Sequence, residues 1–239
     1  MTGKRNDEQD LGIMLIDFNP VVREGLQAIL AKDEHIVVTG DVPDGPAAVL
    51  HIKRSRERGN PVHVVLTEAR SGKMDGVQAT RLIKETYPEI AVLVLTENLN
   101  DSYVIDAIDA GAGGYIFLKD TGPEALLDCV HRVAQGSSQI KTELLYTAVE
   151  NLIQNGRKTL AERTTEAANL TAREVDVLRL MGNGDSNKEI ALALNITLDT
   201  TKKHVHNVIE KLQARSRVHA AIIAAQSGII GKPVTNADQ

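Results

Sequence analysis

The sequence predicts a two-domain protein, an α/β domain with a doubly wound parallel sheet followed by a small all-α domain. Three observations support this prediction. Short apolar runs alternate with helical patterns over the first 135 residues, three helix starts lie close together between residues 170 and 217, and the two parts carry net charges of opposite sign. At 239 residues the chain is long enough for each domain to bury a core of its own.

The α/β prediction comes from five strand–helix units in succession. Continuous apolar runs predict strands buried on both faces, and the amphipathic stretches between them predict helices. Units of this length predict a parallel sheet with helices on both faces, in which functional residues lie at the carboxyl ends of the strands. The predicted strands are Ile13–Ile16, Ile36–Thr39, Val62–Leu66, Ala91–Leu95 and Tyr115–Leu118, and the predicted helices are Pro20–Ala31, Gly45–Arg58, Val77–Thr86, Asp101–Ala110 and Pro123–Ala134.

Two capping boxes mark helix starts in the all-α part. Thr171 precedes Glu174 by three positions, and Ser186 precedes Glu189 by the same spacing. In such a pair each side chain satisfies a backbone N–H group at the start of the helix. The sequence therefore predicts one helix after Thr171 and a second after Ser186.

Two further helices follow in this part of the chain. The first is predicted from Asp199 to Leu212, with apolar residues on one side and Lys202 and Lys203 on the other. The second begins at Ser216, is rich in Ala and Ile, and ends at Gly228. This layout is typical of a helix-turn-helix unit that presents one helix to DNA.

Charge is distributed unevenly between the two parts. Residues 1–135 carry a net charge of −7, whereas Thr197–Arg217 carries +3. A positive stripe on one helix is enough to neutralise several phosphates. The acidic total of −5 therefore does not oppose binding to double-stranded DNA.

Composition limits the compartment and the class of function. Cys129 is the only cysteine, so no intrachain disulfide is possible, and a reducing, cytoplasmic setting is expected. The first ten residues lack the apolar run of a secretory signal, and no segment is long and apolar enough to predict a membrane span. The sequence shows no Gly-rich phosphate loop, no Ser/His/Asp constellation and no metal-ligand cluster, so we expect no enzyme, no cofactor and no metal.

Four motifs of the C-terminal part together resemble the DNA-binding domain of LuxR/FixJ/NarL-type transcription regulators. They are Leu-Thr-x-Arg-Glu from Leu170, Ser-Asn-Lys-Glu-Ile-Ala from Ser186, Thr-x-Lys-x-His-Val from Thr201 and Lys-Leu-x-x-Arg-Ser-Arg from Lys211. The resemblance implies a homodimer paired through the last helix and a domain spanning residues 166–231. It also implies base contacts in the major groove from Lys202, Lys203 and His206, and phosphate contacts from Lys188, Thr200, Thr201, Asn207 and Arg215; surface solvation is the alternative at each position.

Residues at the ends of the predicted strands resemble the receiver domain of two-component response regulators. They are the run from Phe18 to Leu26, Lys73 to Gly76, Leu95-Thr96 and Lys119-Asp120. The resemblance covers residues 11–135 and implies a flavodoxin-like sheet with strand order 2-1-3-4-5. Residues 136–165 form the predicted linker, within which Thr142–Gln154 predicts an amphipathic helix.

The chain departs from the receiver pattern at the residues that carry its chemistry. A working receiver has an acidic pair after the first strand, an aspartate that accepts phosphate, a Thr or Ser, and a Lys, and its acids bind magnesium. Here the acidic pair reads Asp17-Phe18 and the acceptor position is Glu68, while Thr96 and Lys119 are present. The ring of Phe18 offers no oxygen to a metal, and Glu68 is one methylene too long, so aspartyl phosphorylation is impossible at this position.

The fifth strand carries one residue more than the family pattern Gly-Tyr-x-x-Lys. The chain has three residues between Tyr115 and Lys119. Because side chains alternate along a strand, one extra residue displaces Tyr115 or Lys119 unless a bulge absorbs it. This puts the usual switch, in which a Thr and an aromatic residue follow the phosphate, in doubt.

Several roles remain open for the residues of this degenerate phosphoacceptor pocket. Glu68 either stands in for phosphoaspartate by reaching Lys119 or is a solvated carboxylate. Asp17 either pairs with Lys119 or binds a metal, of which the ion pair is favoured. Thr96 is either part of the switch or a strand-end hydroxyl bonded to the backbone.

The sequence thus predicts a sequence-specific, double-stranded-DNA-binding transcription regulator whose receiver does not use ordinary phosphorylation. Regulation would come through dimerisation, a partner protein, a ligand or abundance. One alternative is a regulator phosphorylated in an unusual way, and another is a protein-interaction adaptor that has lost DNA binding.

Overall fold

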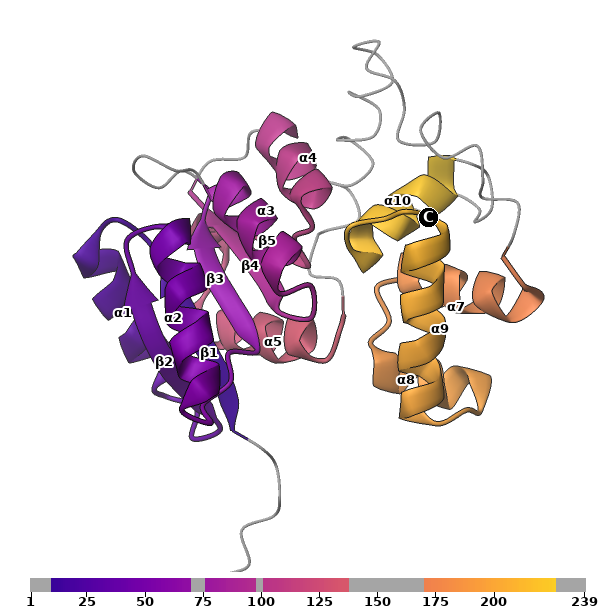
Figure 1. Ribbon diagram of the computed structural model, residues 1–239, viewed down its shortest axis with the longest axis horizontal. Helices are drawn as coiled ribbons and strands as arrows, with labels where there is room; N and C mark the ends of the chain where they lie inside the picture. Colours follow the sequence, from indigo (N-terminus) through magenta and orange to yellow (C-terminus); the bar gives the residue numbers. More distant parts are fainter. Residues whose placement is uncertain (1–9, 70–75, 98–100, 138–169, 227–239) are drawn as a thin grey trace, which may run out of the picture.

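The computed structural model describes residues 10–69, 76–97, 101–137 and 170–226 and places them in two domains (Figure 1). The amphipathic helix predicted for Thr142–Gln154, most of the predicted linker and the C-terminal tail lie outside the described residues. Among the residues that are described, no helix combines the length and the apolar character that a membrane span needs.

The N-terminal domain is a five-stranded parallel sheet with the order β2-β1-β3-β4-β5, which confirms the flavodoxin-like prediction. Ladder pairing is regular, apart from one shift between Ile13 and Met14 where β1 meets β2. The strands are β1 (Leu11–Ile16), β2 (Ile36–Val42), β3 (Val64–Glu68), β4 (Ala91–Thr96) and β5 (Gly114–Phe117).

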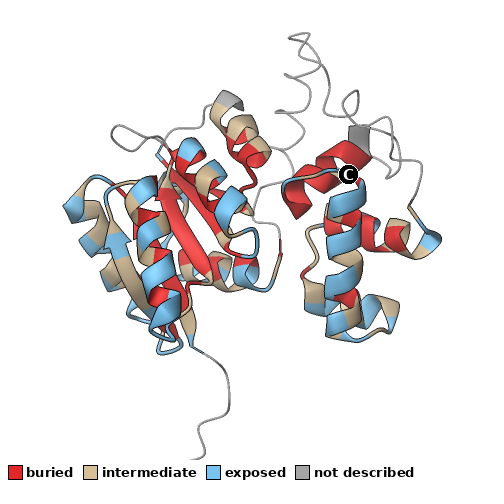
Figure 2. Ribbon diagram, viewed as in Figure 1, coloured by how far each residue is buried: buried red, intermediate tan, exposed pale blue. Residues whose placement is uncertain are grey.

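Helices cover both faces of this sheet, and each face has its own apolar core (Figure 2). On one face α1 (Pro20–Leu30) and α5 (Pro123–Ala134) pack against β1, β3 and β4. On the other face lie α2 (Gly45–Glu57), α3 (Gly76–Thr86) and α4 (Asp101–Ala110). The central strands are almost fully buried, which explains why they form continuous apolar runs in the sequence.

The C-terminal domain contains α7 (Ala172–Gly182), α8 (Asn187–Leu194), α9 (Leu198–Lys211) and α10 (Arg217–Gln226). Both predicted capping boxes are confirmed. The Thr171 N–H donates to Glu174 Oε2 at 2.7 Å, and the Ser186 N–H donates to Glu189 Oε2 at 2.6 Å. Leu178, Met181, Ile190 and other apolar residues, buried from water, join these helices in a third core.

Candidate DNA interface and receiver pocket

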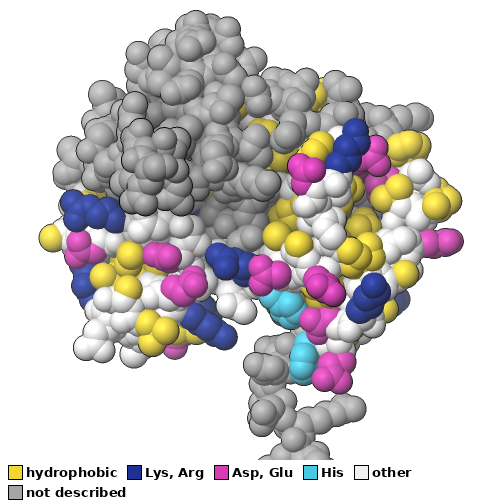
Figure 3. Space-filling view, turned by 180° about the vertical axis from the view of Figure 1, so that it is seen from behind, with side chains coloured by type: hydrophobic (Ala, Val, Ile, Leu, Met, Phe, Trp, Pro, Cys, Tyr) yellow, Lys and Arg dark blue, Asp and Glu magenta, His cyan; other side chains and the backbone are white. Residues whose placement is uncertain are grey.

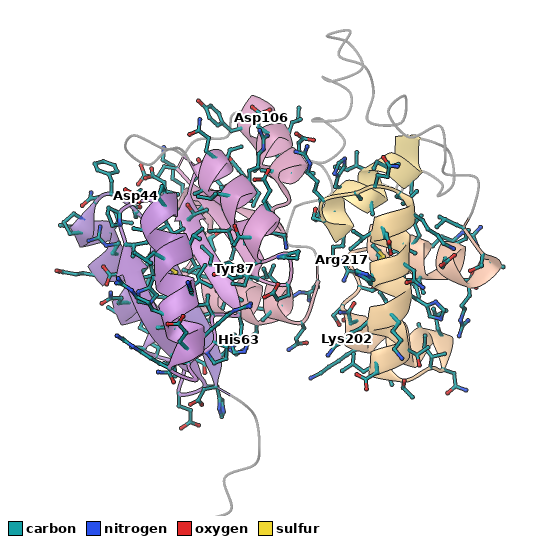
Figure 4. All side chains as sticks on the ribbon, viewed as in Figure 1. Asp44, His63, Tyr87, Asp106, Lys202 and Arg217 are labelled. Carbon is teal, nitrogen blue, oxygen red and sulfur yellow. The ribbon has the colours of Figure 1, made fainter. Side chains whose placement is uncertain are left out.

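The outer side of α9 exposes the side chains that sequence analysis assigns to DNA. Lys202, Lys203, His206 and Asn207 are all exposed, and Figure 4 shows Lys202 on this helix. The opposite side of α9 is held in the domain core by Val208, which is fully buried. The helix therefore presents polar and cationic groups in one direction while its apolar side fixes its position.

Thr201 does not take the predicted role of a phosphate contact. Its side chain is fully buried, and its hydroxyl donates to the Thr197 carbonyl oxygen at 3.1 Å. Thr197 is the N-cap of α9 and accepts the Thr200 N–H at 3.1 Å, so Thr200 lies at the start of the helix. The prediction for Thr201 is wrong because its side chain points into the domain core, whereas the side chain of the next residue, Lys202, is exposed.

An ion pair fixes the end of α9 to the start of α7. Lys211 Nζ lies 2.7 Å from Glu174 Oε2, and Glu174 is only 3% exposed. Burial alone would raise the pKa of Glu174, but hydrogen bonds from Lys211 and Thr171 outweigh it and lower this pKa. Glu174 thus serves both as a helix cap and as an anchor for the helix that carries the DNA-facing side chains.

The remaining predicted phosphate contacts lie in different surroundings. Lys188 is exposed on α8, as a phosphate contact requires. Arg215, in the turn after α9, instead donates from Nη1 to the carbonyl oxygen of Asp109 at 2.8 Å and lies 3.1 Å from the Asp109 carboxylate. Seen from behind in Figure 3, the C-terminal domain mixes acidic and basic side chains, so this face carries no surface of a single sign.

Asp17 and Phe18, at the end of β1, differ sharply in exposure. Asp17 is 3% exposed and accepts the Asn19 N–H at 2.7 Å. Burial raises the pKa of Asp17, against the opposing effects of this hydrogen bond and of Arg23. The Phe18 ring is 58% exposed, so the aromatic residue that replaces the second acid is not packed into the core.

Glu68 is the last residue of β3, where a receiver has its acceptor. Burial raises its pKa to about 7, and the negative charges of Asp17 and Glu97 add to the rise. Gly76 packs closely against this strand end, since a Cβ there would lie 1.9 Å from the Glu68 carbonyl oxygen. Sequence analysis did not include Glu97 among the pocket residues. Its position directly after Thr96, at the carboxyl end of β4, could have indicated that it lies there.

Lys119 lies away from the acids that it was predicted to meet. β5 pairs with β4 in regular register, and the extra residue is taken up after the strand by a short 3₁₀ helix, η1 (Leu118–Asp120). Lys119 is exposed on this turn, and within the described parts of the chain it forms no ion pair with Asp17 or Glu68. The Lys119 pairing proposed for each of these acids is therefore wrong, whereas the half-buried Glu68 remains open to solvent, as the alternative of a solvated carboxylate requires.

Tyr115 keeps an inward position next to Thr96. Its ring is 3% exposed, and its buried hydroxyl lies near the Thr96 side chain. Burial raises the pKa of Tyr115, while the Thr96 hydroxyl opposes that rise. The structure thus brings together Asp17, Glu68, Thr96 and Tyr115 at one edge of the sheet and leaves Phe18 and Lys119 exposed.

A receiver-type sheet joined to a helix-turn-helix unit with a cationic outer helix defines the class of DNA-binding response regulators. Comparisons with known proteins agree. Residues 13–131 match the model of the response regulator receiver domain, and residues 168–224 match that of the bacterial regulatory proteins of the luxR family.

Relatives of similar length extend this likeness over nearly the whole chain. The transcriptional regulatory protein DegU of Brevibacillus brevis is 34% identical, covering 93% of this chain and 96% of the relative. The response regulator protein VraR of Staphylococcus aureus is 33% identical, covering 91% and 98%. Among solved structures, Salmonella typhimurium RcsB matches the fold with a TM-score of 0.51 at 22% identity, covering 92% of this chain and 99% of that one.

The chain belongs to the family of response regulators with a LuxR-type DNA-binding domain. It is a DNA-binding transcription regulator, and proteins of this kind are not typical enzymes.

Proposed function

We propose that this regulator controls transcription without aspartyl phosphorylation of its receiver. One observation carries the proposal: Glu68 occupies the acceptor position at the end of β3, where burial and the negative charges of Asp17 and Glu97 raise its pKa to about 7, while Lys119 is exposed on η1. A phosphoryl group brings further negative charge into the pocket. Charges of the same sign at close range disfavour one another, so Asp17 and Glu97 oppose that addition.

The magnesium ion of working receivers does not fit these residues. Phe18 supplies no oxygen where the second acid is needed, and within the described residues no three His, Cys, Asp or Glu side chains are arranged to hold a metal ion. The metal normally neutralises charge on the transferring phosphoryl group. Among the described residues, the charged side chains that shift the pKa of Glu68 are both acids, so neither of them replaces this effect.

We also infer how the chain acts on DNA. It binds specific double-stranded DNA as a homodimer, and α9 supplies the contacts with the bases. The exposed Lys202, Lys203 and His206 support base contacts, and Lys188 supports a phosphate contact. A related fold, RcsB of Salmonella enterica, is described in a solved structure as bound to a promoter.

Labelling with radioactive acetyl phosphate in the presence of Mg²⁺ tests the receiver proposal. The wild-type chain should acquire no stable label, and its DNA affinity should not change with beryllofluoride. The matched variant Phe18→Asp/Glu68→Asp restores both acids, and labelling of this variant alone would locate the block at these two positions. Stable label on wild-type Glu68 would defeat the proposal.

A further inference from the structure

The C-terminal end of α2 carries a concentration of positive charge. The run from Lys53 to Arg58 contains four basic residues and one acid, Glu57, and therefore has a net charge of +3. This equals the net charge of Thr197–Arg217, although residues 1–135 as a whole carry −7. The receiver thus has one strongly cationic segment on an otherwise acidic domain.

Three of these cations lie on the exposed side of α2. Lys53, Arg54 and Arg58 are all exposed, whereas Ser55, between them in the sequence, is buried. Arg58 is the C-cap of the helix, and Arg54 lies four positions before it, so the two side chains are neighbours on the helix surface. We call Lys53, Arg54 and Arg58 the α2 patch.

The fourth cation of the segment, Arg56, is engaged within the fold. Its guanidinium pairs with Glu89 and lies over the ring of Tyr87, 4.6 Å from the ring centre. The side chains of the α2 patch, by contrast, form no ion pair or hydrogen bond with any residue in the described parts of the chain. Their charges are therefore available to a partner.

Helix stability explains little of this charge. Cations in the last turn interact favourably with the helix dipole, which favours Arg54 and Arg58 where they are. Like charges four positions apart, however, destabilise a helix by a comparable amount. The two effects oppose each other, so the pair of arginines brings α2 little net stability, whereas a negatively charged partner would gain from both.

The position of α2 favours a nucleic-acid partner over an acidic protein. Exposed stretches of α2 and of α9 are turned to the viewer together in Figure 2, so one side of the molecule presents both helices. A duplex held by α9 comes close to this side, which raises the effective concentration of phosphate at the receiver. Two of the three cations are arginines, whose guanidinium groups bind phosphate through two parallel hydrogen bonds.

We propose that the α2 patch binds the phosphate backbone of the duplex outside the site that α9 reads. The receiver is then a second, sequence-independent DNA contact, which lengthens the footprint and adds affinity without adding specificity. Glu57, the one acid of the segment, opposes this contact by repelling phosphate. The proposal rests on the proposed function in one respect, namely that α9 binds double-stranded DNA.

Two duplexes and a charge variant of the full chain test this contact by fluorescence anisotropy. The short duplex holds only a site that the wild-type chain selects from a random library, and the long duplex adds random flanks of about two helical turns on each side. Arg54→Gln/Arg58→Gln should weaken binding to the long duplex about three- to tenfold and lower its salt dependence by about two phosphate contacts. Its binding to the short duplex should remain at the wild-type value.

Two further variants separate the α2 patch from a general effect of charge. Lys32→Glu lowers the net charge by the same two units at an exposed site after α1, on the opposite face of the sheet, and should leave binding to both duplexes unchanged. Glu57→Gln removes the opposing acid and should tighten binding to the long duplex alone.

Equal affinity of the wild-type chain for the two duplexes overturns the proposal and leaves the α2 patch to an acidic protein. The proposal also fails if Arg54→Gln/Arg58→Gln loses as much affinity on the short duplex as on the long one, or if Lys32→Glu weakens binding to the long duplex as strongly. Specific binding to the short duplex without any gain from the flanks rejects only the α2 contact.

Failure of the wild-type chain to select any site rejects the proposed reading of DNA by α9. The α2 contact is then measured on a random duplex of the longer length. Weaker binding of Arg54→Gln/Arg58→Gln than of the wild-type chain would support the contact there, and equal binding would reject it as well.

Discussion

The recognition helix and the receiver pocket differ in how completely each retains the groups that its chemistry needs. α9 presents Lys202, Lys203 and His206 to solvent from a helix that is firmly packed. The pocket keeps Asp17, Thr96 and Lys119 in its sequence but has a phenyl ring in place of the second acid and a longer acid at the acceptor position. Both lie on regular elements, so the difference shows that a fold and its chemistry depend on separate sets of residues.

The reason is energetic. The receiver sheet is held by buried apolar side chains such as Ile13, Leu66 and Leu93, whose burial from water supplies most of the stabilisation. The polar residues at the strand ends contribute little to that stability. A change from acid to Phe at position 18 leaves the ring exposed and the sheet undisturbed.

Glu174→Ala should give the largest effect, because the firm packing of α9 depends on it. The change removes a helix cap and the buried partner of Lys211, and we expect the free energy of unfolding of the C-terminal domain to fall by about 2–3 kcal/mol. Glu189→Ala is the matched control, because it removes a capping box without such an ion pair and should cost about 1 kcal/mol. Denaturant titration followed by circular dichroism measures both. Equal losses would show that the Lys211 contact has no stabilising effect.

Lys202→Ala tests the recognition side of the comparison directly. If Lys202 contacts a base, specific binding should weaken by about 1–3 kcal/mol while binding to random duplex changes little. Lys188→Ala, the phosphate-contact control, should weaken binding to all sequences alike and reduce its salt dependence. Fluorescence anisotropy with specific and random duplexes distinguishes them. A uniform loss in Lys202→Ala would make this residue a backbone contact.

Sequence periodicity and capping chemistry were sufficient to predict the helices and strands, while the strand order 2-1-3-4-5 was implied by the family resemblance. All five strands and both capping boxes are confirmed, because buried parallel strands are continuous apolar runs and each box is a local pattern of two residues. The third strand was placed two residues early, at Val62–Leu66, although it runs from Val64 to Glu68. Apolar residues that precede a strand resemble those within it.

Contacts between distant segments were not predictable. Arg215 was assigned to phosphate from its motif, and nothing in the sequence indicates its contact with Asp109, 106 positions away. Thr201 was assigned to DNA because a motif fixes position along the helix but not which side faces inward. The displacement of Lys119 was one of three predicted outcomes, beside a bulge and a displaced Tyr115, and the position of η1 after the strand decides between them.

Glu68→Gln tests the charge balance of the pocket through pH. The pKa of Glu68 is about 7 in the folded chain against 4.5 ordinarily, so between these values the folded chain binds more protons than the unfolded chain. The free energy of unfolding therefore falls as the pH rises through this window. After allowance for solvent screening, Glu68→Gln should stabilise the chain by about 1 kcal/mol at about pH 8 and by little at about pH 5.

Thermal unfolding across this pH range gives the measurement for Glu68→Gln. Glu85→Gln, which changes an exposed acid of α3, is the control and should leave the pH dependence as in the wild-type chain. A destabilised Glu68→Gln at about pH 8 would mean that the ionised carboxylate has a favourable partner, as a mimic of phosphoaspartate requires.

Lys119→Ala should have the smallest effect of these substitutions. A small effect would show that Lys119, unlike Lys202, has lost the role that its motif implies. Lys119 is exposed on η1, so its loss should change the free energy of unfolding by less than about 0.5 kcal/mol. A lysine close to Glu68 would lower the pKa of that carboxyl, and its removal would raise it. The pKa of Glu68, followed by NMR of its side-chain carboxyl carbon, should therefore be the same in Lys119→Ala and in the wild-type chain. A rise in this pKa on substitution would return Lys119 to the pocket and restore to the receiver the cation that a phosphoryl group needs.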